Sequence, residues 1–115
     1  MTTNTPALPL ETDCRTVKSR LDQTDDFLLL DCRERDEHST ANIAQATLIP
    51  MSELAARAAE LERFRDKDII VHCHHGGRSM RVTNWLRDQG YARAQSMAGG
   101  IDAWSQEIDP AVPRY

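Results

Sequence analysis

Residues 69–71 read Ile-Ile-Val, a short β-branched run that predicts a buried strand. The run leads to Cys73, and two glycines, Gly76 and Gly77, then allow a tight loop whose backbone N–H groups can turn inward. From Ser79 onward the apolar residues recur at helical spacing. This order constrains the whole chain, because it places Cys73 at a helix N-terminus, where unpaired N–H groups favour an anion.

A cysteine in this setting is a candidate nucleophile, because only the thiolate attacks and helix N-termini and nearby cations lower the pKa of a thiol. No Asp or Glu occurs in residues 69–87, whereas Arg78, Arg81, Arg87 and three histidines do. The whole chain has a formal net charge of −4, so this stretch is locally basic. A core cysteine would not usually be followed by five polar or glycine residues. We therefore predict a reactive Cys73 that handles an anionic substrate.

The neighbouring side chains allow more than one interpretation. Arg78 could direct its guanidinium at an oxyanion, or pair with Asp31 or Glu34 to hold the loop. His74 and His75 could gate the loop mouth or shuttle a proton, or could simply be solvated. Adjacent residues of one tight segment cannot all face one ion, so no metal site is predicted.

Length and composition restrict the class of protein. The chain has 115 residues, enough for one domain with a single core. No apolar run reaches membrane-spanning length, and the N-terminus lacks the features of a signal peptide, so we expect a cytoplasmic protein without a membrane partner. Three scattered cysteines suit a reducing compartment. A sequence pI near 5.5 argues against nucleic acid as a partner.

The elements expected along the chain alternate between strands and helices. An arm over residues 1–9 precedes one domain over 10–107, and a tail over 108–115 follows. Thr12 or Asp13 is expected to cap a first helix, and Gly90 to end the helix that begins at Ser79. A further helix is expected at 35–40. Another should begin at a cap on Ser52, with Leu54, Ala58 and Leu61 facing the core. A short helix should follow Gly99-Gly100, with Ile101 and Trp104 facing the core. Strands are expected at 27–30, 46–49 and 93–97 besides the one that ends at Cys73.

This alternation indicates an α/β fold with a mainly parallel sheet. The strand ends that carry Asp31, Cys73 and Gly99 would then share one edge, where open α/β sheets bind ligands. Cys14 is interpreted as a small buried hydrophobe. Cys32 is not expected to act as a resolving thiol for Cys73.

Four segments then follow in a recognisable order: Leu30-Asp31-Cys32-Arg33-Glu34, Ile49-Pro50-Met51-Ser52-Glu53-Leu54, Ile70-Val71-His72-Cys73-His74-His75-Gly76-Gly77-Arg78-Ser79 and Met97-Ala98-Gly99-Gly100-Ile101-Asp102-Ala103-Trp104. Together they resemble the single-domain rhodaneses, a family of sulfurtransferases, over about residues 10–107. The resemblance implies a five-stranded, mainly parallel sheet with helices on both faces. It also implies that Cys73 takes a sulfane sulfur from a donor such as thiosulfate, becomes a persulfide, and passes the sulfur to cyanide or a thiol.

The same resemblance implies roles for individual residues. Cys73 would be the catalytic residue, and the N–H groups of the loop would hold the anionic persulfide. The expected substrate-binding residues are His74, His75, Gly76, Gly77, Arg78 and Ser79, and the expected supporting residues are Asp31 and Arg33. No metal or organic cofactor is expected, because the enzyme itself carries the sulfur. The expected partners are a small anionic sulfur donor and a thiol or protein acceptor.

One segment departs from the family pattern. Where related chains usually carry Gly-His-Ile-Pro-Gly-Ala, this chain reads Ala41-Asn42-Ile43-Ala44-Gln45-Ala46. Loss of the proline and glycine predicts a looser turn, and loss of the histidine removes a frequent neighbour of the site.

Two other functions compete with sulfur transfer. A phosphatase of related fold needs five residues between its cysteine and arginine, whereas four separate Cys73 from Arg78. A non-catalytic binding or sulfur-relay module is the other alternative, but such modules often lose the cysteine that is present here.

Overall fold

The computed structural model describes residues 8–115, so the arm predicted at residues 1–9 lies almost wholly outside the described residues. Five strands form one sheet in the spatial order β1-β5-β4-β2-β3, and every neighbouring pair is parallel. The strands are β1 (Glu11–Thr12), β2 (Phe27–Asp31), β3 (Thr47–Leu48), β4 (Asp68–His72) and β5 (Ala94–Met97). The predicted parallel α/β fold is confirmed.

Continuous apolar runs make β2 and β4 the central strands, because a strand covered on both faces has no polar side to present. Residues 28–30 and 69–71 are buried. The two strands pair along their whole length, from Phe27 opposite Asp68 to Asp31 opposite His72. Their carboxyl ends therefore reach the same edge of the sheet.

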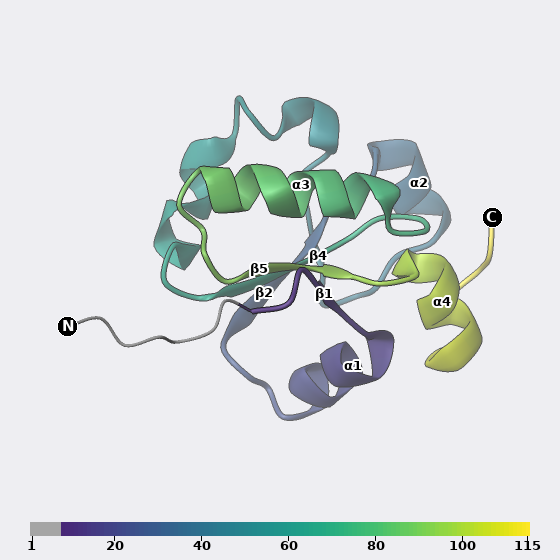
Figure 1. Ribbon diagram of the computed structural model, residues 1–115. Helices are drawn as coiled ribbons and strands as arrows, with labels where there is room; N and C mark the ends of the chain where they lie inside the picture. The colour runs from purple at the N-terminus through teal and green to yellow at the C-terminus, as the bar shows by residue number, and fades with distance from the viewer. Residues whose placement is uncertain (1–7) are drawn as a thin grey trace.

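Helices cover both faces of the sheet (Figure 1). One face is covered by α3 and two 3-10 segments, and the other by α1 and α4. The helical elements are α1 (Cys14–Asp22), α2 (Arg35–Thr40), the 3-10 helices η1 (Met51–Glu53) and η2 (Ala58–Phe64), α3 (Gly77–Asp88) and α4 (Gly100–Glu107). The carboxylate of Asp13 caps α1, accepting a hydrogen bond of 2.7 Å from the Thr16 N–H. Gly90 follows α3 with φ of +98°, as its predicted role at the helix end requires.

Two local predictions are corrected by the structure, and one strand was not predicted. The helix expected from Ser52 is replaced by the two 3-10 segments, although Leu54 and Leu61 are buried. A 3-10 helix rises about 2.0 Å per residue against about 1.5 Å in an α-helix, so the segment spans a longer path from β3 at the sheet edge to β4. The helix α3 begins at Gly77, two residues before the predicted Ser79. Strand β1 was not predicted, because two residues show no periodicity.

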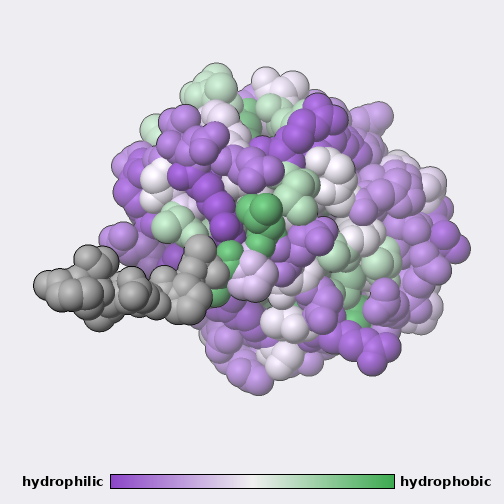
Figure 2. All heavy atoms as spheres, viewed as in Figure 1, coloured by the Kyte–Doolittle hydropathy of each residue, from purple (hydrophilic) through white to green (hydrophobic). Residues whose placement is uncertain are grey.

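The surface carries few large apolar side chains. The face in Figure 2 is mostly hydrophilic, with small apolar areas between polar ones. Leu10 and Tyr115 are the exposed large hydrophobic residues of the described chain. None of the helices formed by residues 8–115 is long and apolar enough to span a membrane.

Candidate active site

The predicted nucleophile lies at the carboxyl edge of the sheet, in the loop between β4 and α3. Cys73 directly follows β4, and the loop ends at Gly76, whose φ of +120° suits a residue without a side chain. Cys73 is only 1% exposed and packs against the core that lies under α3. Its sulfur is therefore buried, so its reactivity depends on which groups face it.

Hydrogen-bond donors of the loop surround the Cys73 sulfur. The Gly76 N–H points to Sγ at 3.0 Å and the Ser79 N–H at 3.3 Å. The Ser79 hydroxyl oxygen lies 3.4 Å from Sγ and 2.7 Å from the hydroxyl of Ser96 on β5. This arrangement can stabilise a negative charge on sulfur. The structure thus adds Ser96, which the sequence analysis did not single out.

These donors give Cys73 a lower pKa than the other two thiols of the chain. Burial raises the pKa of the Cys73 thiol, but the Ser79 hydroxyl and the backbone N–H groups of Ser79, Gly76 and Arg78 more than offset burial, and the pKa lies below the ordinary 9.0. Burial raises the pKa of Cys14 to about 11 and raises that of Cys32 as well. Cys73 is the thiol that ionises most readily.

Helix α4 explains why the loop amides turn inward. The Ile101 N–H donates to the Cys73 carbonyl at 2.9 Å, and the Asp102 N–H donates to the His74 carbonyl at 3.1 Å. The Cys73 and His74 carbonyls therefore face α4, whereas the N–H groups of Gly76 and Ser79 face the sulfur. This approach needs Gly100, which has φ of +59°, because a Cβ there would lie 2.5 Å from the Cys73 oxygen and 2.4 Å from the His74 oxygen.

Arg78 pairs with a carboxylate that the sequence analysis did not name. Its guanidinium binds Glu37 of α2 at 2.6 and 2.8 Å, rather than Asp31 or Glu34. The Arg78 hydrogen bonds, opposed by burial, lower the pKa of Glu37 to about 2, so the pair is charged at neutral pH. The side chain of Arg78 thus holds the loop against α2.

Asp31 and Arg33 form a buried ion pair beneath the site. Both side chains are 0% exposed, with Nη2–Oδ2 at 2.7 Å and Nε–Oδ1 at 3.0 Å. Arg33 also donates to the Ala41 carbonyl at 2.6 Å. This hydrogen bond stabilises the start of the turn at residues 41–46, which departs from the family pattern. His38 of α2 places its Nδ1 3.1 Å from the Asp31 carboxylate, so a histidine contacts the buried ion pair.

The two loop histidines stack with a residue from the end of the described chain. The His74 ring lies 3.9 Å from the Tyr115 ring at an interplanar angle of 6°, and 3.9 Å from the His75 ring at 30°. The Tyr115 hydroxyl donates to Glu37 at 2.9 Å and accepts from Arg33 at 2.8 Å. Tyr115 therefore joins the loop, α2 and the buried ion pair, and no short-range sequence pattern predicts this contact.

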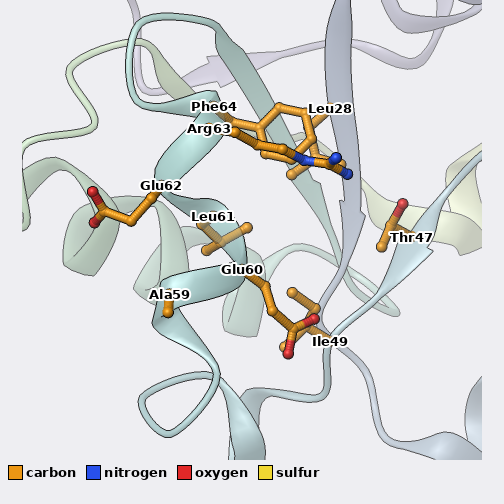
Figure 3. A pocket seen from close by; sticks show the side chains of 9 residues that line it. All are labelled: Leu28, Thr47, Ile49, Ala59, Glu60, Leu61, Glu62, Arg63 and Phe64. Carbon is orange, nitrogen blue, oxygen red and sulfur yellow. The ribbon is translucent and has the colours of Figure 1, made fainter.

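A cavity lies away from the Cys73 loop. It has a volume of about 480 Å³ and is lined by Leu28, Thr47, Ile49 and residues 59–64 (Figure 3). Leu28 lies near the amino end of β2, whereas Cys73 follows the carboxyl end of β4. No cysteine or histidine lines this cavity, so the Cys73 loop is the candidate active site.

The fold and the site together define a class of protein: a parallel α/β domain that holds a cysteine sulfur against backbone N–H groups at the start of a helix. Residues 13–107 match the family model described as Rhodanese-like domain, and the chain belongs to this family. The resemblance predicted from the four sequence segments is thus confirmed.

Two relatives of similar length, from Allochromatium vinosum and Bacillus subtilis, carry the names sulfurtransferase and putative sulfurtransferase. A sulfurtransferase of Allochromatium vinosum is 34% identical over 102 residues, which cover 89% of this chain and 94% of that protein. The Rhodanese-like/PpiC domain-containing protein 12, chloroplastic, of Arabidopsis thaliana is 36% identical over 93 residues, but only 31% of that longer protein is covered. The crystal structure of a rhodanese-related protein from Thermoplasma volcanium superposes with a TM-score of 0.76 at 30% identity, covering 91% of this chain and 98% of that one. The sulfurtransferase relative, which this chain covers almost completely, supports a rhodanese-type enzyme.

Proposed function

We propose that this protein transfers a sulfane sulfur from a small anionic donor such as thiosulfate to a thiophilic acceptor through a persulfide on Cys73. The observation that carries the proposal is the convergence of the Gly76 and Ser79 N–H groups on Cys73 Sγ, at 3.0 and 3.3 Å. A persulfide places its negative charge at the same loop, so the donors that stabilise the thiolate also favour the intermediate.

The reaction proceeds in two displacements. The Cys73 thiolate attacks the outer sulfur of thiosulfate, the sulfur–sulfur bond of the donor breaks, and sulfite leaves with the bonding electron pair. The acceptor, cyanide or a thiolate, then attacks the terminal sulfur and restores the Cys73 thiolate. Neither displacement requires a metal or organic cofactor, so we propose a reaction that uses none.

The loop favours one sulfur atom over a phosphate group. Only four residues separate Cys73 from Arg78, and both outer nitrogens of the Arg78 guanidinium are engaged by Glu37. A phosphatase loop needs a longer span and an arginine directed at the substrate. Because Cys73 is 1% exposed, a donor that presents a single terminal sulfur is the best match to the site.

The proposal is tested by intact-mass analysis and steady-state kinetics. Brief exposure to thiosulfate or 3-mercaptopyruvate should add about 32 Da, the mass of one sulfur, because a thiolate accepts it. Cys73→Ser should abolish the gain, whereas Cys14→Ser and Cys32→Ser should retain it. With thiosulfate and cyanide varied together, double-reciprocal plots should be parallel, as a ping-pong reaction requires. Wild-type protein that gains no mass with any donor would falsify the proposal.

A further inference from the structure

The sheet register places a second thiol beside the nucleophile. Asp31 of β2 is paired with His72 of β4, so the next residues along the two parallel strands are Cys32 and Cys73. The Cys32 N–H continues the ladder, donating to the His72 carbonyl at 3.1 Å. Neighbouring parallel strands lie about 4.8 Å apart, and disulfides need Cα atoms about 4.4–6.8 Å apart. The backbone spacing therefore allows a bond between the two sulfurs.

The side chains of the two cysteines also share a face of the sheet. In-register residues of neighbouring strands point to the same side, and Cys32 and Cys73 both belong to the core under α3. The sulfur of Cys32 makes no hydrogen bond within residues 8–115, and no cysteine is bonded to another in the structure. Cys14, by contrast, is buried in the core on the opposite face, against α4. Cys32 is thus the one thiol positioned to reach the Cys73 sulfur.

We propose that Cys32 is a resolving thiol that discharges the Cys73 persulfide as sulfide when no acceptor is present. This inference rests on the proposed function, which supplies the persulfide. It revises the expectation from sequence alone, because the sequence does not give the register between β2 and β4.

The step is balanced without an external oxidant. The Cys32 sulfur attacks Cys73 Sγ, the bond between Cys73 Sγ and the terminal sulfur breaks, and the Cys32 proton leaves with that sulfur as HS⁻. The terminal sulfur is reduced to sulfide and the Cys32 sulfur is oxidised, while Cys73 Sγ exchanges one sulfur–sulfur bond for another and keeps its oxidation state. A dithiol such as dithiothreitol then reduces the disulfide and restores both thiols.

The environment of Cys32 makes its attack on the persulfide slower than attack by an abundant acceptor. Burial, reinforced by the nearby Cys73 and Asp31, raises the pKa of the Cys32 thiol, so little thiolate is present at neutral pH. Attack by Cys32 is therefore slow compared with attack by an abundant acceptor, because exchange rates depend on the thiolate fraction. The resolving step would release stored sulfur only when acceptors are scarce.

The test follows a loaded protein after the donor is removed. Protein is loaded with thiosulfate or, independently of any enzymatic activity, with inorganic polysulfide, and then desalted. In the wild type the gain of about 32 Da should change to a loss of about 2 Da while one equivalent of sulfide appears. Tryptic peptides containing Cys32 and Cys73 should then be joined. The rate should not depend on protein concentration, because the reaction is intramolecular.

Matched variants distinguish the two cysteines. Cys32→Ala and Cys32→Ser should keep the persulfide more than about tenfold longer, whereas Cys14→Ser should behave as the wild type. Circular dichroism confirms that each variant is folded. Loading by polysulfide but not by thiosulfate would contradict the proposed function. The attack of Cys32 on the persulfide could still be tested with the polysulfide-loaded protein. A wild-type persulfide that lasts as long as that of Cys32→Ala, or sulfide release without the crosslinked peptide, would overturn the inference. If neither reagent loads the protein, the thiol oxidant diamide must still produce the Cys32–Cys73 crosslink. Absence of this crosslink would equally overturn the inference.

Discussion

Glu37 holds Arg78 through both outer guanidinium nitrogens, with Oε1–Nη1 at 2.6 Å and Oε2–Nη2 at 2.8 Å. The pair joins α2 to the loop that carries Cys73, and the Tyr115 hydroxyl completes the contact at 2.9 Å from Glu37. Because the Arg78 backbone N–H also helps to lower the pKa of Cys73, the position of Arg78 affects both the fold and the reactivity of the loop.

Glu37→Gln should therefore destabilise the protein in a pH-dependent manner. The folded-state pKa of Glu37 is lowered from 4.5 to about 2, chiefly by the Arg78 hydrogen bonds. A lowered carboxyl pKa stabilises the folded state fully above the unfolded value of 4.5, and this contribution is lost as the pH falls toward 2. Urea unfolding should show wild type more stable than Glu37→Gln by about 1–2 kcal/mol at pH 7, with the difference shrinking below pH 4.5.

A suitable control for this variant is Glu11→Gln. Glu11 is exposed and forms no ion pair within residues 8–115. Its replacement should leave the free energy of unfolding within about 0.5 kcal/mol of the wild-type value. A Glu37→Gln difference that does not change between pH 7 and pH 3 would contradict the assigned ion pair.

Gly100→Ala should disrupt the fold at the active loop. The new Cβ would lie within 2.6 Å of the backbone of Cys73 and His74, and the residue has a positive φ. We expect a loss of more than about 2 kcal/mol in unfolding free energy, together with loss of sulfur loading. Gly77→Ala is the matched control, because a Cβ there meets nothing within 4 Å. Chemical denaturation of the two variants compares them directly, and similar losses for both would contradict the close approach of α4 to the loop.

Ser79→Ala should raise the pKa of Cys73 without removing the backbone donors. The Ser79 hydroxyl is the strongest of the groups that lower this pKa. The rate of Cys73 alkylation by iodoacetamide at pH 7 should fall about three- to tenfold, and the pH profile should shift to higher pH. Thr83→Val, on the same helix and one turn further along, should leave the profile unchanged. Peptide mapping separates Cys73 from Cys14 and Cys32, and an unshifted profile for Ser79→Ala would exclude the hydroxyl as a stabilising group.

Tyr115→Ala should loosen the cover over the loop. The variant loses the ring stacked at 3.9 Å on His74 and the hydroxyl that binds Glu37 and Arg33. We expect faster alkylation of Cys73 and a loss of about 1–2 kcal/mol in unfolding free energy. Tyr115→Phe keeps the stacking, so its alkylation rate and its free energy of unfolding should lie between those of the wild type and Tyr115→Ala. Alkylation of Tyr115→Ala at or below the wild-type rate would show that this side chain does not restrict access to the thiol.

Sequence patterns predict the parts of the site that are local. The apolar run of β4 and the glycines after Cys73 determine a strand, a loop and a helix within residues 68–88, and the structure has all three. The side chain that binds Arg78 is 41 positions away, and several acidic residues compete for the role in the sequence. Spacing alone does not distinguish Glu37 from Asp31 or Glu34.

Contacts between distant segments are the other part that the sequence does not predict. Ser96 is a single small polar residue on a strand with weak periodicity, and it becomes relevant only because β5 lies beside β4. Tyr115 contacts Arg33 across 82 positions. The two-residue strand β1 and the 3-10 winding of residues 51–53 and 58–64 likewise depend on packing against the finished sheet.

A single-turnover transfer tests the central claim most directly. Protein is loaded with thiosulfate, desalted at once to remove the donor, and mixed with cyanide, and thiocyanate is measured together with the intact mass. We predict about one equivalent of thiocyanate per wild-type chain and loss of the added 32 Da, with neither result for Cys73→Ser, because the sulfur is carried on this one thiolate. Loaded wild-type protein that gives no thiocyanate, or Cys73→Ser that gives as much as the wild type, would contradict a sulfur-carrying role for Cys73.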